Sequence, residues 1–219
     1  MEDFMALLSC LCVLFTVGMF TTGLSDLHKM FSTRSVDNIQ FLPFLTTDLN
    51  NIGWFYYGYL KDDWTLMSVN CIGISLQTLY ILVYLRFTPE KCSILMKCLV
   101  SLAVLFLGYC YFYIQIPDVP TRLSRLGLFF SILTIGMYMS PLIDLAKIIK
   151  TKSTKCLSFP LTVATFLTST SWVLYGMQLN DPYIMVPNFP GILTSLLRFW
   201  LFWQYPSEKE TYQYRQVQA

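Results

Sequence analysis

Residues 54–58, Trp-Phe-Tyr-Tyr-Gly, return 118 positions later as Trp-Val-Leu-Tyr-Gly at residues 172–176. Around them, residues 15–85 and 133–203 align without a gap, and roughly twenty of about seventy aligned positions are identical. Asp63 aligns with Asp181, and Asn70 aligns with Asn188. Unrelated sequences would share only a handful of positions. The chain therefore contains an internal repeat, and this repeat decides most of the fold.

The composition indicates a membrane protein. The chain of 219 residues is 55% hydrophobic and only 13% charged, whereas a soluble domain is about 25% charged. The net charge of +2 gives no reason to expect a nucleic-acid partner. The seven cysteines lie mostly in apolar runs and suit small hydrophobic side chains. A single histidine, His28, argues against a multi-histidine metal site or histidine-based catalysis.

Seven apolar runs are long enough to cross a bilayer, since a spanning helix needs about 20 residues. The first three match the last three, and the fourth has no counterpart in the repeat. The expected fold class is an all-α membrane protein of seven transmembrane helices, with two parallel three-helix bundles joined by a linker helix (3+1+3). The expected spans cover residues 4–24, 39–60, 66–85, 93–115, 126–149, 157–179 and 183–205. The expected domains are a first repeat (1–88), a linker with its flanking loops (89–122), a second repeat (123–205) and a cytosolic tail (206–219).

Lysine and arginine placement predicts the orientation. Roughly eleven of these residues fall on one side of the expected spans and about three on the other. Because the positive side is cytosolic, we expect a cytosolic C-terminus and, with seven spans, an extracellular or luminal N-terminus.

Hairpin geometry predicts which repeated residues share a depth in the membrane. The second and third expected spans form a hairpin with its midpoint near Asp62, and Trp54 lies eight residues before this point and Asn70 eight after. Trp172 and Asn188 lie equally far from Asn180. At about 1.5 Å per helical residue, all four fall at one level, roughly 10 Å below the outer end. In transporters built from parallel repeats, the substrate site lies on the axis between the repeats.

A ring of two indoles and two amides suits a sugar. The apolar faces of a pyranose fit aromatic rings, while an amide both donates to and accepts from hydroxyl groups. We therefore predict a substrate site of Trp54, Asn70, Trp172 and Asn188. The alternative is that the tryptophans form an interfacial belt and the asparagines only hold helices together.

Other features of the spans are candidates for gating and coupling. Tyr57 and Asp181 lie nearer the outer mouth and are able to close it, although ordinary interfacial placement explains them equally well. Asp48 is an acid inside a span whose repeat partner is Phe166. It suits either proton coupling or a hydrogen bond to a neighbouring helix. Prolines, which bend helices, interrupt three spans and suggest rocking hinges at Pro43, Pro141 and Pro160.

At these residues the sequence resembles the SWEET sugar transporters, in particular their animal members. The resemblance covers nearly the whole chain. It rests on Thr-Lys-Ser-Thr at 151–154 with Thr-Arg-Ser-Val at 33–36, Ser-Trp-Val-Leu-Tyr-Gly at 171–176, Asp-Pro at 181–182 and the duplicated asparagines. SWEET proteins are themselves among the parallel-repeat transporters for which a site between the repeats is known.

The resemblance implies downhill sugar movement by alternating access, without a cofactor, in the plasma membrane, the Golgi or both. It implies that Asn70 and Asn188 hydrogen-bond the sugar between Trp54 and Trp172, and that Tyr57 and Asp181 belong to the outer gate. The family has four hinge prolines, but the position that matches Pro141 in the first span is Gly23. Two tryptophans in the site favour a monosaccharide such as glucose over a disaccharide.

Two other function classes stay open from the sequence alone. A proton-coupled carrier of another small solute would use Asp48. A seven-helix receptor also has an outside N-terminus, but the parallel repeat and the short loops argue against it. An enzyme is not expected, because no nucleophile and base recur at one depth. The expected partners are a small-molecule sugar and the lipid bilayer, and the sequence leaves homo-oligomerisation open.

Overall fold

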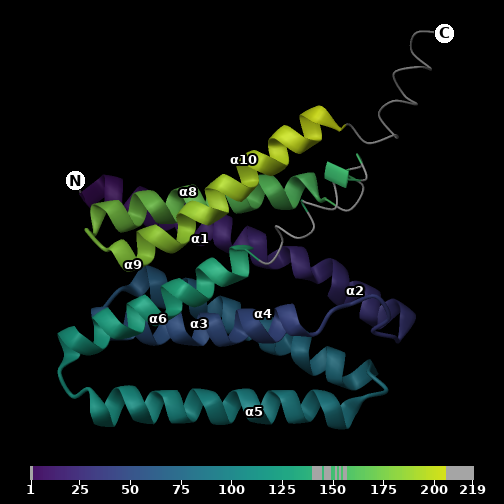
Figure 1. The fold of residues 1–219 in the computed structure, drawn as a ribbon, viewed down its shortest axis with the longest axis horizontal. Coiled ribbons are helices and arrows are strands. Elements are labelled where there is room, and N and C mark those ends of the chain that lie inside the picture. Colours follow the sequence, from purple (N-terminus) through teal and green to yellow (C-terminus); the bar gives the residue numbers. More distant parts are fainter. Residues whose placement is uncertain are drawn as a thin grey trace. The chain divides into compact units, whose positions relative to one another are not determined.

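The computed structural model describes residues 2–139, 145, 149–150, 152, 154 and 157–205. These residues form helices and turns, without a strand among them (Figure 1). In chain order, the elements are α1 (Glu2–Phe20), the 3₁₀ turn η1 (Thr21–Gly23), α2 (Leu24–Thr33), α3 (Leu42–Lys61), α4 (Trp64–Phe87), α5 (Lys91–Cys110), the π-helical turn η2 (Tyr111–Gln115), α6 (Val119–Met139), α8 (Phe159–Gln178), α9 (Pro182–Met185), the 3₁₀ turn η3 (Val186–Asn188) and α10 (Phe189–Gln204).

The helices have the lengths that membrane spans require. Four described stretches are long and apolar enough to cross a bilayer, namely Asp3–Thr33, Trp64–Phe87, Lys91–Gln115 and Pro182–Gln204. They coincide with four of the apolar runs seen in the sequence. The other three runs correspond to α3, α6 and α8, which contain 20, 21 and 20 residues.

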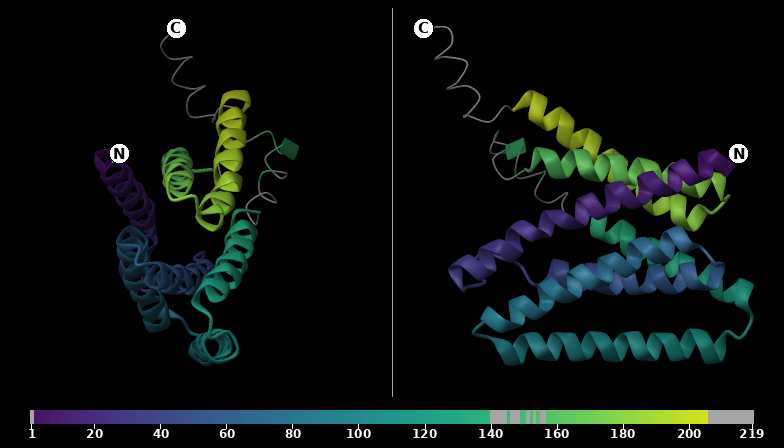
Figure 2. Two further views of the ribbon diagram at one scale, coloured as in Figure 1. Left: turned by 90° about the vertical axis from the view of Figure 1, so that its left-hand side faces the viewer. Right: turned by 180° about the vertical axis from the view of Figure 1, so that it is seen from behind.

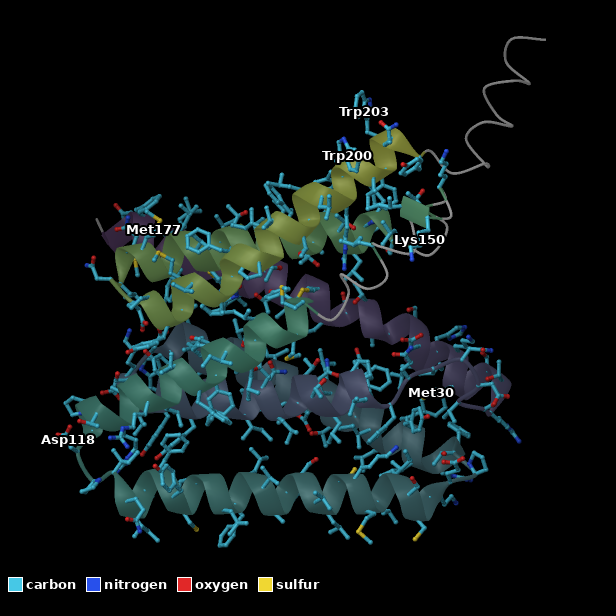
Figure 3. The ribbon with its side chains drawn as sticks, viewed as in Figure 1. Met30, Asp118, Lys150, Met177, Trp200 and Trp203 are labelled. Carbon is cyan, nitrogen blue, oxygen red and sulfur yellow. The ribbon has the colours of Figure 1, made fainter. Side chains whose placement is uncertain are left out.

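The chain divides into two compact units. One comprises residues 9–130, and the other comprises residues 1–8 and 131–219. In the first unit, α3 and α4 pair along their lengths, and α8 and α10 form the corresponding pair in the second (Figure 2). Many apolar side chains of α5 are exposed, including Leu102, Val104, Phe106 and Leu107. Trp200 and Trp203 project outward from α10 (Figure 3).

A tight turn joins α3 to α4. Asp62 adopts a left-handed conformation with φ of 55° and ends α3. The Asp63 N–H then donates to the Gly58 carbonyl at 2.9 Å. The Asp63 carboxylate accepts from the Leu66 N–H, also at 2.9 Å, and caps the start of α4. These bonds satisfy backbone groups that the two helix ends would otherwise leave without partners.

The turn between α8 and α9 has the same construction. Asn180 is left-handed with φ of 49°, and the Asp181 N–H donates to the Gly176 carbonyl at 2.9 Å. The Asp181 carboxylate accepts from the Tyr183 N–H at 2.9 Å and the Ile184 N–H at 3.3 Å. The repeat seen in the sequence is therefore also a repeat of backbone geometry.

The interiors of the two helix pairs differ. In the first unit the α3–α4 pair packs large apolar and aromatic residues, with Phe44 against Tyr80 at 5.4 Å between ring centroids. In the second unit the buried positions of α8 include Thr162, Thr165 and Ser169. The Thr162 and Thr165 hydroxyls donate to the carbonyls one turn earlier, at 2.9 and 2.8 Å. Small polar residues of this kind allow membrane helices to approach closely.

The prolines do not kink the interiors of α3 and α8, which differs from the sequence expectation. Pro43 and Pro160 each occupy the second residue of a helix, where the missing N–H costs no intrahelical bond. The two prolines are one position out of step in the ungapped alignment, yet they have the same place relative to the helix start. Gly23 lies in η1, at the break between α1 and α2. Pro141 lies outside the described residues.

Candidate substrate-binding site

Asn70 and Asn188 have the same local geometry in the two units. The Asn70 side-chain Nδ2 donates to the Leu66 carbonyl at 2.7 Å, and the Asn188 Nδ2 donates to the Ile184 carbonyl at 2.8 Å. Each bond joins residues four apart and orients the amide toward the preceding turn of the backbone. An amide has a second N–H and a carbonyl oxygen with two lone pairs. Each asparagine therefore keeps donor and acceptor capacity after it has been oriented.

The backbone around the two asparagines differs. Asn70 lies within the continuous helix α4, whereas Asn188 is the last residue of η3 and immediately precedes α10. Pro187 and Pro190 flank Asn188 and lack the N–H groups that a continuous helix would use. The expected span 183–205 is thus interrupted. The two prolines in the sequence already carry the signal for that interruption.

Trp54 and Trp172 form matching aromatic pairs. The ring centroids of Trp54 and Tyr57 are 5.4 Å apart with an interplanar angle of 79°. Those of Trp172 and Tyr175 are 5.5 Å apart with an angle of 87°. Both are edge-to-face arrangements of residues three apart on one helix. Only 8% of Trp54 and 7% of Trp172 is exposed, in contrast to the exposed Trp203.

Within each unit, the tryptophan and the asparagine are equally distant in sequence from the turn residue. Trp54 and Asn70 are each eight positions from Asp62, on adjacent helices that run in opposite directions. Trp172 and Asn188 stand in the same relation to Asn180. Each unit therefore carries one indole and one amide near the same level of its helix pair.

The residues expected at the outer gate have clear structural contacts. Asp181 caps α9, as described above, and Asp63 has the equivalent position in the first unit. Tyr57 packs on Trp54 and lies beneath the Lys61 ammonium, which is 5.9 Å from the ring centroid. These contacts account for the positions of Tyr57 and Asp181 before any gating role is considered.

Some buried polar residues have no identical counterpart in the internal repeat, so comparison of the two repeats does not identify them. Asn51 and Gln77 are buried polar residues in the same unit as Asp48. Their signal in the sequence is the presence of amides within apolar spans. Arg122 lies outside the expected spans, yet it is buried, and its guanidinium donates to the carbonyls of Tyr113, Ile116 and Pro117.

Comparison with known proteins identifies the class. The family described as "Sugar efflux transporter for intercellular exchange" matches residues 6–92 and 124–210. A protein named Sugar transporter SWEET1 from Xenopus tropicalis is 66% identical over 210 residues, which cover 96% of this chain and 98% of that protein. Its human namesake is 62% identical over 199 residues, covering 91% and 90%.

A solved structure has the same fold. The 3.7 Å structure of a eukaryotic SWEET transporter aligns with a TM-score of 0.85 at 23% identity, over 92% of this chain and 96% of that chain. The class is therefore an all-α membrane protein with the 3+1+3 arrangement of seven helices, as the repeat predicts. The chain belongs to the SWEET transporter family, which confirms the resemblance seen in the sequence.

Proposed function

We propose that the protein is a facilitative, bidirectional sugar uniporter that moves a monosaccharide such as glucose by alternating access. The observation that carries this proposal is the duplicated amide, Asn70 and Asn188, each bonded to the backbone carbonyl four residues earlier. The names of its relatives, Sugar transporter SWEET1, support the same substrate class.

The proposed site uses the amides and indoles together. A sugar hydroxyl both donates and accepts, and so does the remaining part of each amide. The bond from Nδ2 to the backbone orients the amide before the sugar arrives, which lowers the entropic cost of binding. Trp54 and Trp172 supply flat apolar surfaces for the C–H faces of the ring. None of these groups is charged, in keeping with a neutral substrate.

Weak binding is an advantage for this function. A millimolar dissociation constant corresponds to about −4 kcal/mol, and a tighter site would slow the release of sugar. Two or three neutral hydrogen bonds, each worth about 0.5–1.5 kcal/mol net, together with stacking on the indoles, provide an affinity of that order.

The remaining features of the proposal concern organisation. The bundles comprise residues 1–88 and 123–205, with residues 89–122 as the linker and 206–219 as a cytosolic tail. The N-terminus lies outside or in the lumen, and the protein resides in the plasma membrane, the Golgi or both. Tyr57 and Asp181 form the outer gate, and Gly23, Pro43, Pro141 and Pro160 act as hinges. Self-association into a homo-oligomer is compatible with this organisation.

Uptake of labelled glucose into liposomes of purified protein tests the site. We expect Asn70→Ala and Asn188→Ala to abolish uptake while the proteins remain folded in thermal unfolding assays. Gln178→Ala, which removes an exposed amide from the last residue of α8, is the matched control and should transport normally. Uptake like that of the wild type in both asparagine variants would refute the site.

The same liposomes separate uniport from proton coupling. A uniporter equilibrates glucose whether or not a pH gradient is imposed. A strict requirement for the gradient would instead favour a proton-coupled carrier.

A further inference from the structure

Three buried polar side chains in the unit of residues 9–130 each have an atom without a hydrogen bond. Asp48 and Asn51 lie on α3, and Gln77 lies on α4. Their exposed fractions are 9%, 4% and 7%. The unbonded atoms are Asp48 Oδ1, Asn51 Nδ2 and Gln77 Oε1. Such groups are rare in protein interiors because each loses its hydrogen bonds to water without replacement.

The helix register places these side chains close together. The Thr78 hydroxyl donates to Asp48 Oδ2 at 3.3 Å, which puts Asp48 level with the Gln77–Thr78 peptide. Asn51, one turn from Asp48, packs against the backbone of Gly73, where even a methyl group would overlap its amide. Gly73 is one turn from Gln77 on the same face of α4. The absence of a side chain at Gly73 thus provides the space for the asparagine.

The surroundings of Asp48 offer a negative charge one hydrogen bond and no ion pair among the described residues. Among the residues that the structure describes, its one polar contact is Thr78. Of the titratable groups on the neighbouring helices, Cys98 on α5 lies within electrostatic range of Asp48, and the Tyr80 hydroxyl on α4 is bonded to the Phe20 carbonyl. The cations of these helices, Arg86 on α4 and Lys91 and Lys97 on α5, are exposed side chains. A buried carboxylate without a cation costs several kcal/mol, and such a group is generally neutralised.

The second repeat has no equivalent of this cluster. The residues that align with Asp48, Asn51 and Gln77 are Phe166, Ser169 and Ser195. Phe166 packs on Phe199 with ring centroids 5.8 Å apart. The Ser195 hydroxyl donates to the Gly191 carbonyl at 2.7 Å, and Ser169 shares a hydrogen bond of 3.3 Å with Tyr138. A helix pair of this fold therefore packs without a buried acid, so the acid in the first repeat is not needed for the fold.

We propose that Asp48, Asn51 and Gln77 form a proton-binding site in the first repeat, and that its protonation state sets the rate of transport. A proton from solution adds to Asp48 Oδ1. The resulting hydroxyl then donates to Gln77 Oε1, which otherwise has no hydrogen-bond donor. When this proton returns to solution, a net negative charge stays between α3 and α4. That charge opposes the movement of the two helices within an apolar interior, so transport slows as pH rises. The proton is not carried across the membrane with the sugar.

Infrared spectroscopy of the reconstituted protein tests proton binding without reference to transport. We expect a carbonyl stretching band of a neutral carboxylic acid that disappears as pH rises. It should be absent in Asp48→Asn and retained in Asp37→Asn, the matched control that alters an exposed acid in the α2–α3 loop. Gln77→Leu should move the band to higher frequency, because the acid then loses its acceptor. A spectrum of Asp48→Asn identical to that of the wild type would overturn the proposal.

The effect on rate rests on the proposed sugar uniport and is measured with equal pH on both sides of the liposome membrane. We expect wild-type glucose exchange to fall with rising pH, approaching about tenfold per pH unit once the protonated form is the minor one. Asp48→Asn, which imitates the neutral acid, should exchange glucose at a rate independent of pH, whereas Asp37→Asn should follow the wild type. A wild-type exchange rate that does not change with pH would overturn the proposal that protonation of Asp48 sets the rate of transport. Absence of glucose exchange at every pH would instead reject the proposed function, and the infrared result would stand by itself.

Discussion

The ring of Tyr80 lies directly against the backbone of Gly23. A Cβ atom at position 23 would be 2.6 Å from Tyr80 Cε2. The Tyr80 hydroxyl also donates to the Phe20 carbonyl at 3.1 Å. That carbonyl is available because the Leu24 N–H bonds to the Thr21 carbonyl in the 3₁₀ turn and not to Phe20. A residue of α4 thus holds the break between α1 and α2, at the glycine that aligns with Pro141 in the repeat.

Gly23→Ala is expected to destabilise this break. The added methyl group has to displace a fully buried aromatic ring, and overpacking of this kind typically costs about 1–3 kcal/mol. Thermal unfolding of the detergent-solubilised protein should show a lower midpoint, and glucose uptake should fall with it. Gly18→Ala is the control, because nothing lies within 4 Å of the added methyl group. Equal unfolding midpoints for the two variants would show that Tyr80 yields without cost.

Tyr80→Phe tests the hydrogen bond separately from the packing. The ring stays in place, but the Phe20 carbonyl loses its donor, which should cost about 0.5–1.5 kcal/mol of stability. If the break acts as a hinge, the initial rate of glucose uptake should also change, since α1 and α2 are then less firmly attached to α4. A lower unfolding midpoint with an unchanged uptake rate would assign the bond to stability alone.

The two capping aspartates should have similar effects when removed. Asp63→Ala and Asp181→Ala each delete an N-cap, which costs about 0.5–2 kcal/mol. Asparagine at either position retains a capping oxygen, so Asp63→Asn and Asp181→Asn should restore most of the unfolding midpoint. If Asp181 also serves the outer gate through its charge, Asp181→Asn should remain stable and yet transport more slowly. Normal transport by Asp181→Asn would limit this residue to capping.

The turn between each helix pair could be predicted because its determinants are local and duplicated. Asp62 with Asp63, and Asn180 with Asp181, combine a residue that tolerates the left-handed conformation with an N-cap, and both features are legible in the sequence. The equal spacing of Trp54 and Asn70 from the turn follows from these residues alone. The positions of the prolines relative to the helix starts were harder to predict, since helix ends are set by a few weak preferences.

Contacts between distant residues could not be predicted from the sequence. Gly23 and Tyr80 belong to different helices, and the alignment compares Tyr80 only with Arg198. The unpaired atoms of Asn51 and Gln77 depend on how α3 and α4 are rotated against each other. Hydrophobicity hardly restricts this rotation in helices that carry apolar residues on exposed as well as buried positions. The start of α6 at Val119, before the expected Leu126, has a different cause, which is local in the sequence.

Asp118 and Arg122 together explain that early start. The Asp118 carboxylate, in the turn before α6 (Figure 3), accepts from the Thr121 N–H at 2.9 Å and caps the helix. Hydrogen bonds from Thr121 and the nearby charge of Arg122 hold the pKa of Asp118 below its ordinary value. The polar residues before the expected span, including Thr121 and Arg122, therefore form the first turn of α6.

Replacement of Arg122 should destabilise the protein more than replacement of Asp118. Its Nε donates to the Ile116 carbonyl at 2.9 Å, and Nη2 donates to the carbonyls of Pro117 at 3.3 Å and Tyr113 at 3.4 Å. The guanidinium also lies over the Tyr113 ring, 5.2 Å from its centroid. Hydrogen bonds that involve a charged group contribute about 1.5–3 kcal/mol. The ammonium group of lysine lacks the planar array of N–H donors that makes these hydrogen bonds.

We therefore expect Arg122→Lys to lower the thermal unfolding midpoint of the solubilised protein, even though the charge is unchanged. Arg125→Lys alters an exposed arginine one turn further along α6 and should leave the midpoint as it is. Loss of stability in Arg122→Lys alone would locate the effect in the carbonyl contacts. If both variants unfold like the wild type, the bonds between the guanidinium and the carbonyls of residues 113–117 contribute little, and the capping by Asp118 has to hold this turn by itself.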